Sequence, residues 1–568
     1  MIIFFQKDSI VYAVESACEL SAEDTMKLSW LFSNASRVEN AEVEGVFIGP
    51  RREMVTPWST NAVEITRNMG LTGITRIEML TSCSSEEADP MLQEIYNNLS
   101  QDIFLQKREP EPVRYIDDLR AYTQNEGLAL SEEEICYLES LSQKLQRSLT
   151  DSEIFGFSQV NSEHCRHKIF NGEFVIDGQT MPSSLFGLIK KTSKEYPNRL
   201  VSAYKDNVAF VEGPDAEQFS PLRHDQPDFF HTRKIETVLS LKAETHNFPT
   251  TVEPFNGAAT GSGGEIRDRM AGGIGSIPMA GTAVYMTSYS RLSDDKAWEK
   301  NITPRNWLYQ SPAEILIKAS NGASDFGNKF GQPLICGSLL TFEHQENNKT
   351  FGYDKVIMQA GGIGHANKKH ALKKEPEIGD NVVVLGGDNY RIGMGGGAVS
   401  SVATGEFSKA IELNAVQRSN PEMQKRVFNA IRAMAEMDEN PVVSIHDHGA
   451  GGHLNCLSEL LEKGGTIEMD KLPIGDNTLS AKEIIGNESQ ERMGLLLKSK
   501  DVDLLQRIAE REYAPMYVVG EATDNHRLTF QQSQAETCPI NLEVEDLFGN
   551  PPKTVMTDST VVENFKPT

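Results

Sequence analysis

The chain has 568 residues and a formal net charge of −26, a length that exceeds one ordinary hydrophobic core and predicts three or four domains of a folded globular protein. The acidic balance disfavours nucleic-acid binding, which needs a basic face, and no uncharged apolar run is long enough to span a membrane. Seven scattered cysteines without a Cys-x-x-Cys pair predict reduced thiols and a cytoplasmic protein.

Residues 1–128 are expected to form a small α+β domain. A helix is predicted to begin after Ser21, because Asp24 stands at its third position and an apolar face follows. Short apolar runs predict four strands, at 2–5, 10–14, 46–48 and 74–80.

Residues 129–170 are expected to form a compact helical linker. Two capping boxes, in which Ser or Thr precedes Glu by three positions, mark helix starts: Ser131 with Glu134 and Thr150 with Glu153. Each box contributes about 1 kcal/mol and so defines its boundary well.

The linker also contains Asn-Ser-Glu-His-Cys-Arg-His, at 161–167. Asn161 or Ser162 can cap a short helix there, which would place His164 and His167 on one face. Taken alone, this pattern is more typical of two partly exposed histidines than of a zinc site, which would need further ligands.

Residues 171–367 are rich in glycine and carry β-type apolar runs, at 208–211, 239–243, 282–286 and 315–319. The second run ends in Glu244 and His246, which share a face with Lys242 if the strand continues that far. A carboxylate at a strand end suits Mg²⁺, and a histidine there can act as acid or base. A polar strand end at the solvent boundary explains the same residues equally well.

The next segment, Gly-Ala-Ala-Thr-Gly-Ser-Gly-Gly-Glu-Ile-Arg-Asp at 257–268, predicts a phosphate-binding loop. Its four glycines permit positive φ, and successive backbone N–H groups in such a loop form a nest for anions. We expect a helix to begin near Glu265, with Arg267 able to grip a phosphate and Asp268 able to hold a metal. A flexible surface loop is the weaker alternative.

Residues 368–568 alternate strands and helices, with a strand at 382–385 and helical patterns at 421–437 and 454–462. Asp447 follows a strand at 442–445 and precedes a glycine turn, and hydrogen-bonding groups are concentrated in Asn-Glu-Ser-Gln-Glu-Arg-Met, at 487–493. Taken alone, each of these two segments is more typical of a turn than of a site. His446, His448 and His453 lack the spacing of a structural zinc site, and the glycines at 386–397 do not fit a dinucleotide fingerprint.

Together these segments resemble phosphoribosylformylglycinamidine synthase, the formylglycinamide ribonucleotide (FGAR) amidotransferase of purine biosynthesis. The motifs at 161–167, 242–250 and 257–268 resemble its synthase core, and those at 445–452 and 488–493 its second lobe. Gly49-Pro-Arg51 and Thr56–Ala62 resemble the N-terminal domain of the large single-chain form.

The resemblance implies a multidomain α+β and α/β fold: the N-terminal domain, the linker, and one two-lobed half of a core similar to aminoimidazole ribonucleotide synthetase. Residues 171–367 would be lobe A and residues 368–568 lobe B. It implies a Mg²⁺-dependent ligase with ATP as substrate. The γ-phosphoryl group goes to the FGAR amide oxygen, and ammonia then displaces it to give an amidine.

Site residues carried over from the family are expectations of the resemblance. The catalytic histidines would be His164 and His246, and the metal ligands would be Glu244, Asp268 and Asp447. Substrate contacts would be Thr245, Asn247, Arg267, Glu488, Ser489 and Gln490. Nucleotide contacts would be Gly257, Ala258, Ala259, Thr260, Gly261, Ser262, Gly263, Gly264, Glu265, Ile266, Arg267, Asp268, Thr341, Phe342 and Glu343.

Two departures from the family pattern are visible in the sequence. His448 and His453 stand where the family usually has apolar residues. The second synthase half and the glutaminase domain have no counterpart here, so ammonia would come from a separate glutaminase domain or subunit. We therefore expect the isolated chain to be inactive or very weak.

Two other classes of function compete with this interpretation. One is another enzyme of the superfamily, such as the ribonucleotide cyclase, selenophosphate synthetase or thiamine-phosphate kinase, which would lack the N-terminal domain and the Ser-Glu-His-Cys helix. The other is a non-catalytic scaffold or assembly subunit, against which the set of His164, Glu244, His246 and Asp268 argues.

Overall fold

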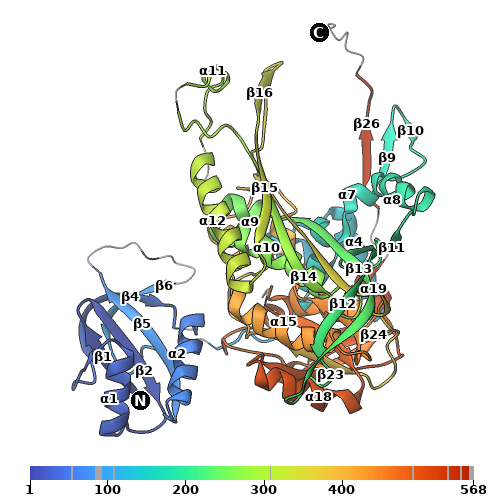
Figure 1. The fold of residues 1–568 in the computed structure, drawn as a ribbon. Helices are drawn as coiled ribbons and strands as arrows, with labels where there is room; N and C mark the ends of the chain where they lie inside the picture. The colour runs from blue at the N-terminus through green and yellow to red at the C-terminus, as the bar shows by residue number, and fades with distance from the viewer. Residues whose placement is uncertain are drawn as a thin grey trace. The chain divides into compact units, whose positions relative to one another are not determined.

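A computed structural model describes residues 1–52, 55–83, 88, 93–105, 109–293, 295–306, 309–488, 491–533, 537–549 and 553–561. The chain divides into two compact units (Figure 1). The first unit comprises Met1–Glu111 with two short later segments, Asp388–Tyr390 and Ile474–Leu479, and the second unit comprises the remainder. The domain boundaries expected at 128, 170 and 367 stay predictions. No helix among the described residues is both long and apolar enough to cross a bilayer.

The first unit is a six-stranded antiparallel sheet in the order β3-β1-β2-β5-β4-β6. The strands are β1 (Ile2–Lys7), β2 (Ile10–Ser16), β3 (Ser36–Arg37), β4 (Val43–Pro50), β5 (Ile74–Ser82) and β6 (Gln93–Leu99). The helices are α1 (Ala22–Leu31) and α2 (Pro57–Asn68). The four predicted strands and the capping box of Ser21 with Asp24 are confirmed.

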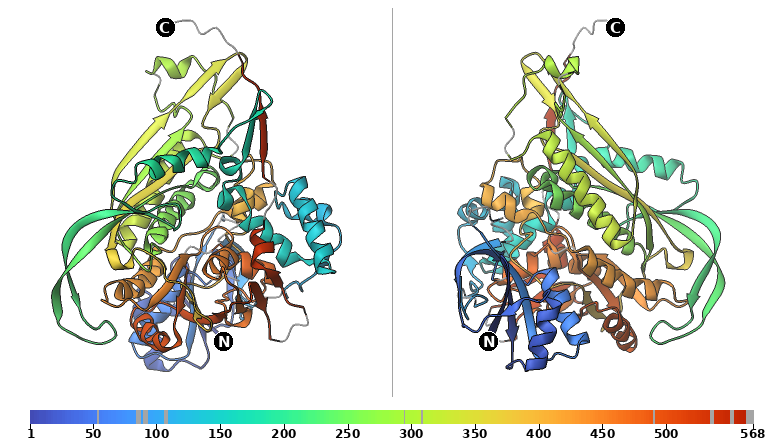
Figure 2. Two further views of the ribbon diagram at one scale, coloured as in Figure 1. Left: turned by 90° about the vertical axis from the view of Figure 1, so that its right-hand side faces the viewer. Right: turned by 60° about the vertical axis from the view of Figure 1, so that its left-hand side comes forward.

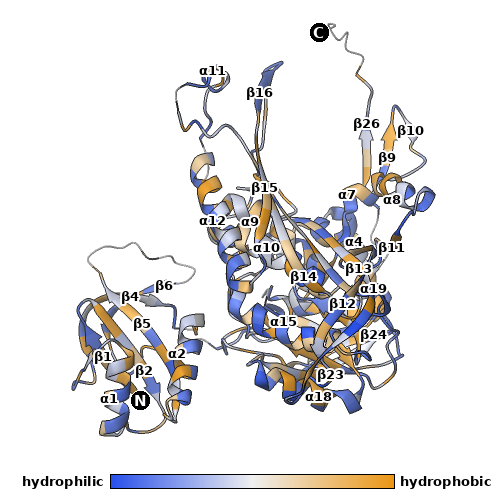
Figure 3. Ribbon diagram, in the orientation of Figure 1, coloured by the Kyte–Doolittle hydropathy of each residue, from blue (hydrophilic) through white to orange (hydrophobic). Residues whose placement is uncertain are grey.

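Both faces of this sheet are covered, as the run of apolar residues in β1 requires. Ile3 and Phe5 pack with Leu28 of α1 and Val63 of α2, whereas Phe4, on the other face, belongs to a second cluster. The strands accordingly carry hydrophobic residues over much of their length (Figure 3).

The second unit opens with helices. They are α3 (Leu119–Glu126), α4 (Glu132–Leu145), α5 (Asp151–Val160), α6 (Glu163–Arg166) and α7 (Lys168–Asn171), with a small pairing of β7 (Tyr115–Ile116) and β8 (Leu149–Thr150). The capping boxes predicted for Ser131 and Thr150 are present at the starts of α4 and α5. Helix α5 is buried along its whole length, so it forms part of the core.

A six-stranded sheet follows, in the order β11-β12-β13-β18-β14-β15, with only β15 parallel to its neighbour. Its strands are β11 (Leu200–Ser202), β12 (Ala209–Pro221), β13 (Phe230–Thr245), β14 (Ile277–Thr287), β15 (Leu334–Thr341) and β18 (Ile357–Asn367). The helices that pack with it are α9 (Asn247–Val252), α10 (Pro254–Met270) and α12 (Pro312–Phe330). Strands β12 and β13 form a long curved hairpin (Figure 2).

One predicted strand in this region is wrong. Residues 315–319 lie in helix α12, which begins at Pro312 with a capping box of Ser311 and Glu314. The buried positions Ile315, Ala319 and Phe326 recur at helical spacing over a window longer than the run itself. Smaller elements lie near this sheet in sequence: β9 (Glu173–Ile176), β10 (Gln179–Thr180), α8 (Leu185–Glu195), α11 (Ala297–Lys300), β16 (Glu343–Glu346), β17 (Lys349–Gly352) and η1 (Lys368–His370).

The last part of the chain builds a seven-stranded sheet in the order β20-β22-β19-β23-β21-β24-β25. Its strands are β19 (Asn381–Leu385), β20 (Val442–Asp447), β21 (Gly465–Glu468), β22 (Met493–Leu497), β23 (Met516–Ala522), β24 (Arg527–Gln531) and β25 (Ile540–Glu543). The accompanying helices are α13 (Gly396–Val399), α14 (Lys409–Ala415), α15 (Pro421–Ala435), α16 (Gly452–Leu460), η2 (Met469–Lys471), α17 (Ala481–Gly486), α18 (Ser499–Arg511) and α19 (Val544–Phe548). A final strand, β26 (Val555–Asp558), pairs with β9.

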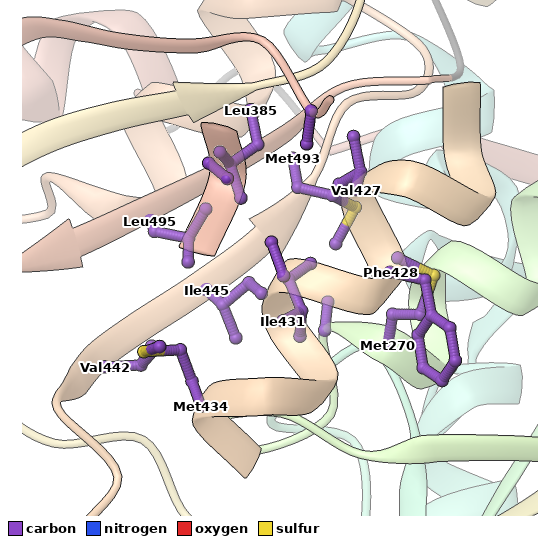
Figure 4. Close-up of a cluster of buried hydrophobic side chains, with 14 of the residues drawn as sticks. Met270, Leu385, Val427, Phe428, Ile431, Met434, Val442, Ile445, Met493 and Leu495 are labelled. Carbon is purple, nitrogen blue, oxygen red and sulfur yellow. The ribbon is translucent and has the colours of Figure 1, made fainter. Parts of the chain in front are cut away.

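One hydrophobic cluster joins the two sheets of the second unit (Figure 4). It contains Met270 of α10, Ile431 of α15 and Ile445 of β20, all with less than 2% of their surface exposed. Helix α10 is therefore fixed between the two sheets, and the end of β20 lies close to it.

Candidate functional site

The second unit contains a cleft of about 1450 Å³. Residues from α6, the end of β13, helix α10, the end of β20 and the loop after α17 line it. The predicted site residues among them are His164, Glu244, Thr245, His246, Asn247, Thr260, Gly264, Arg267, Asp268, Asp447 and Glu488. Motifs that are separated by more than 300 positions in sequence thus share one surface.

His164 reaches the cleft from the four-residue helix α6, which Ser162 caps by accepting a hydrogen bond from the Cys165 amide at 3.3 Å. The helix is shorter than its motif, because His167 adopts a left-handed conformation with φ of 49° and ends it. The prediction that His164 and His167 share one helix face is therefore wrong, although both line the cleft. Dense surrounding protein, with His167 and Lys242 nearby, lowers the pKa of His164.

His246 follows the last residue of β13 and precedes α9. Its Nδ1 contacts the carbonyl oxygen of Gly257, an acceptor only, so Nδ1 carries the proton and Nε2 has the free lone pair. Burial lowers the pKa of His246 to about 4. The ring is therefore neutral near pH 7 and can accept a proton or a hydrogen bond at Nε2.

Helix α10 overturns the prediction of a glycine loop. Residues 257–268 lie inside this helix, none of their glycines has positive φ, and the helix begins at Pro254 rather than near Glu265. Their backbone N–H groups are therefore committed to the helix and form no anion nest.

The glycines of α10 serve close packing instead. A Cβ at Gly257 would overlap the backbone of Pro249 and Thr250, and one at Gly264 would overlap Glu244 Oε1. At Gly261 it would lie 2.8 Å from Met358 Sδ. Without side chains at these positions, the helix can approach β13 and α9 closely enough to bring its polar residues next to Glu244 and His246.

Only one stripe of α10 faces the cleft. Thr260, Gly264, Arg267 and Asp268 recur at the spacing of one helix face. The remaining predicted nucleotide contacts of this segment do not line the cleft: Gly257, Ala258, Ala259, Gly261, Ser262, Gly263, Glu265 and Ile266. Glu265 instead forms a fully buried ion pair with Arg269.

The three predicted metal ligands lie in one polar network. Asn207 Nδ2 donates to Asp268 Oδ1 at 2.9 Å and to Asp447 Oδ1 at 2.7 Å, and so bridges the two carboxylates. Lys242 Nζ lies 2.8 Å from Asp268 Oδ2. Burial and the neighbouring Asp268 raise the pKa of Glu244 well above its ordinary value. Burial opposes ionisation of Asp268 as well, but Lys242 and hydrogen bonds from Glu244 and Asn207 hold its pKa low.

The side chains gathered here are of the chemical type that binds Mg²⁺. Carboxylate oxygens are its preferred protein donors, and Mg²⁺ needs only one or two of them because water and phosphate oxygens complete its octahedron. Glu244, Asp268 and Asp447 supply such oxygens, and crowding of their charges favours a cation between them. In the described part of the chain, no group of three or more His, Cys, Asp or Glu side chains is placed to hold a metal ion together, so the three carboxylates do not form one common metal site in this arrangement.

Three family models match the chain. They describe the formylglycinamide ribonucleotide amidotransferase N-terminal domain at residues 9–104, the linker domain of the same enzyme at 119–168, and the C-terminal domain of AIR synthase related proteins at 377–532. The chain belongs to the formylglycinamide ribonucleotide amidotransferase family.

Two solved structures share the fold of this chain. Thermotoga maritima PurL complexed with FGAR is 24% identical with a TM-score of 0.51, and PurLQS from Thermotoga maritima is 23% identical with a TM-score of 0.50. In both comparisons the match covers 76% of this chain and 58% of the other chain. The chain therefore spans less than two thirds of the length of these relatives.

Other residues predicted from the amidotransferase motifs have mixed outcomes. Glu488 lines the cleft, and its Oε1 accepts hydrogen bonds from the amides of Gly397 at 3.1 Å and Gly451 at 3.2 Å. Burial nevertheless raises the pKa of Glu488 to about 7. Ser489 and Gln490 lie outside the described residues.

The nucleotide contact predicted at 341–343 does not line this cleft. Thr341 ends β15, Phe342 is 46% exposed, and Glu343 is buried against the guanidinium of Arg291. Glu343 is therefore engaged in a structural ion pair.

Sequence reasoning missed Asn207 and Lys373. Lys373 Nζ lies 2.9 Å from Asp206 Oδ1 and 3.4 Å from Asn207 Oδ1, at the edge of the carboxylate network. Both residues stand in loops of ordinary composition, and only the fold brings them to the cleft. No local pattern marks them.

Proposed function

We propose that this chain forms the first half of the synthase core of an FGAR amidotransferase and binds ATP and FGAR in the cleft. The reaction would be the ATP-dependent conversion of FGAR to formylglycinamidine ribonucleotide, which makes the whole enzyme a carbon–nitrogen ligase of purine biosynthesis. The observation that carries the proposal is the meeting of His164, Glu244, His246, Arg267, Asp268 and Asp447 in one cleft.

The chain's own residues suit phosphoryl transfer, which needs positioning and charge neutralisation more than covalent help. Arg267 and Lys242 are cations at the cleft and would bind phosphate oxygens. Neutral His246 would accept a proton or orient the attacking ammonia through Nε2, and His164 faces the same space. Glu244, Asp268 and Asp447 would hold Mg²⁺, which when bound would neutralise phosphate charge.

The substrate contacts proposed from the motifs differ in the hydrogen-bonding groups that they leave available to a ligand. Thr245 is exposed to the cleft and Glu488 presents a carboxyl group there. Asn247 accepts a hydrogen bond at Oδ1 from the Met358 amide, which orients the side chain and leaves its two Nδ2 N–H groups and one acceptor position on Oδ1 for a ligand. Asn247 would donate from Nδ2 to an FGAR or phosphate oxygen.

Two further partners belong to the proposal. A second synthase half would complete the core, and a glutaminase domain or subunit would supply ammonia from glutamine. The isolated chain would then bind ligands but turn over little or no substrate. A non-catalytic scaffold is the alternative, and it has no need for cations and carboxylates gathered in a cleft.

The test measures ADP release with FGAR, ATP and ammonium, with and without a C-terminal synthase half added in trans. Activity that appears only on complementation supports the proposal, whereas a folded but inactive complex favours the scaffold. His164→Ala should abolish product in the complemented enzyme, and full activity in this variant would overturn the role of His164. His344→Ala, on exposed β16 outside the cleft, is the matched control and should keep full activity.

A further inference from the structure

Two histidines, His448 and His453, flank the glycine turn that joins β20 to α16. Both are completely buried, and neither lines the cleft. Across the turn, His448 Nε2 lies 3.0 Å from His453 Nδ1, with the two rings nearly perpendicular. On its other side, His453 Nε2 lies 3.1 Å from Arg492 Nη1.

The direction of these hydrogen bonds follows from Arg492. An arginine guanidinium always donates, so His453 Nε2 must accept and His453 must carry its proton on Nδ1. That proton is then donated to His448 Nε2, which places the proton of His448 on its own Nδ1. Protonation of both nitrogens on either ring would bring two donors face to face, so both rings are neutral.

The network reaches the cleft at both ends. Arg492 also donates to the carbonyl of Asn487 at 2.6 Å, next to Glu488. His448 follows Asp447 directly, and its amide donates to the Arg492 carbonyl at 3.1 Å. Between the histidines, the amide of Gly451 donates to Glu488 at 3.2 Å.

We propose that His448, His453 and Arg492 form a chain of hydrogen bonds, called the relay below, that runs from Arg492 through His453 to His448. The relay closes the glycine turn and fixes Asp447 and the Gly451 amide in position relative to Glu488. An apolar pair could fill the same volume but could not connect the turn to Arg492. The effect on turnover rests on the function proposed above, whereas the hydrogen-bonded relay itself does not.

The tautomers give a direct spectroscopic test. In the full chain with ¹⁵N-labelled histidine, the ring resonances of His448 and His453 should both report a protonated Nδ1 and an unprotonated Nε2 at neutral pH. His448→Leu and His453→Leu assign the signals by their loss. A protonated Nε2 on either ring would overturn the relay.

The positioning role is tested by amide hydrogen exchange over residues 447–453. His453→Leu removes the hydrogen bonds that His448 Nε2 and Arg492 Nη1 make with this ring, and exchange over these residues should rise by about tenfold or more. His448→Leu should have a smaller effect, because Nδ1 of the His448 ring has no hydrogen-bond partner among the described residues and only the bond to His453 is lost. His453→Gln should restore much of the protection, since an amide can accept from Arg492 and donate to His448.

A matched control separates this role from general destabilisation. His224→Leu removes another buried imidazole, outside the cleft, and should leave exchange at 447–453 unchanged. In complemented enzyme, His453→Leu should raise the KM for FGAR more than it lowers kcat, and His453→Gln should reverse that rise. If amide exchange at 447–453 in His453→Leu equals that of the wild-type chain, the relay is overturned, even if the complemented wild-type enzyme is active. If the wild type does not turn over but the tautomers and exchange are as expected, only the proposed function fails.

Discussion

The glycines of α10 allow the fold and the site to be perturbed separately. Gly257→Ala and Gly264→Ala add the same methyl group to the same buried helix, but the group meets different neighbours. At Gly257 it overlaps the backbone of Pro249 and Thr250, which cannot move without shifting α9. At Gly264 it overlaps Glu244 Oε1, the movable end of a side chain. We expect the first variant to lose stability and the second to lose function.

The magnitudes follow from two opposing effects. Alanine in a helix interior is favoured over glycine by about 1 kcal/mol. Overpacking against backbone at Gly257 costs about 3 kcal/mol, so the free energy of unfolding should fall by about 2 kcal/mol. At Gly264 the displaced carboxylate limits that cost to about 1 kcal/mol, and stability should barely change. A misplacement of Glu244 by about 1 Å should nevertheless lower kcat/KM about a hundredfold.

Stability is measured by urea unfolding of each variant, and function by ADP release in the complemented enzyme. The reasoning is refuted if Gly264→Ala is the less stable variant, or if it keeps wild-type kcat/KM while folding normally. Gly261→Ala provides an intermediate case, since its methyl would press on the flexible Met358 side chain at 2.8 Å.

Other variants probe the charges of the second unit. Burial raises the pKa of Glu488 from 4.5 to about 7, so the folded chain holds this proton more tightly than the unfolded chain. The free energy of unfolding should therefore fall by up to about 3 kcal/mol as the pH rises from about 4.5 to about 7. Urea unfolding should show this component lost in Glu488→Gln, and identical pH slopes would contradict it. Arg269→Met leaves buried Glu265 without its cation and should lower the free energy of unfolding by about 3–5 kcal/mol. Adding Glu265→Leu to the same chain should recover part of that loss, and equal stability of the single and double variants would contradict the reasoning. Asn207→Ala should lower the free energy of unfolding by about 1–3 kcal/mol, because it removes the bridge between Asp268 and Asp447. Added Mg²⁺ should restore part of this loss relative to the same variant in EDTA-treated buffer. If Mg²⁺ has no effect, no cation binds at these carboxylates.

Features encoded by neighbouring residues could be predicted from the sequence. The capping boxes of Ser131 and Thr150 place both partners within four positions, and the structure confirms them. The strand at 239–243 was also predicted, because its apolar run is followed at once by polar residues, and it lies in β13, which continues through Glu244 to Thr245. Such signals are local and survive without knowledge of the fold.

Features decided by tertiary packing could not be predicted in this way. Four glycines in the segment 257–268 have low helix propensity, so the local preference is for a loop. Burial on every side opposes that preference, because an irregular loop would leave buried backbone groups unpaired, whereas a helix satisfies them within the segment itself. Asn207 has no local signal at all, since its role depends on Asp268 and Asp447 from two different elements.

The helical form of α10 also changes where negative charge can be bound. Its interior N–H groups donate within the helix, so a phosphate in the cleft must be neutralised by side chains such as Lys242 and Arg267. Lys242 already pairs with Asp268 and Arg267 lies 3.8 Å from Asp447, so a phosphate must compete with these carboxylates. A divalent cation at the carboxylates would release both cations toward the phosphate. Nucleotide and Mg²⁺ should therefore bind with positive cooperativity, each favouring the charge arrangement that the other requires.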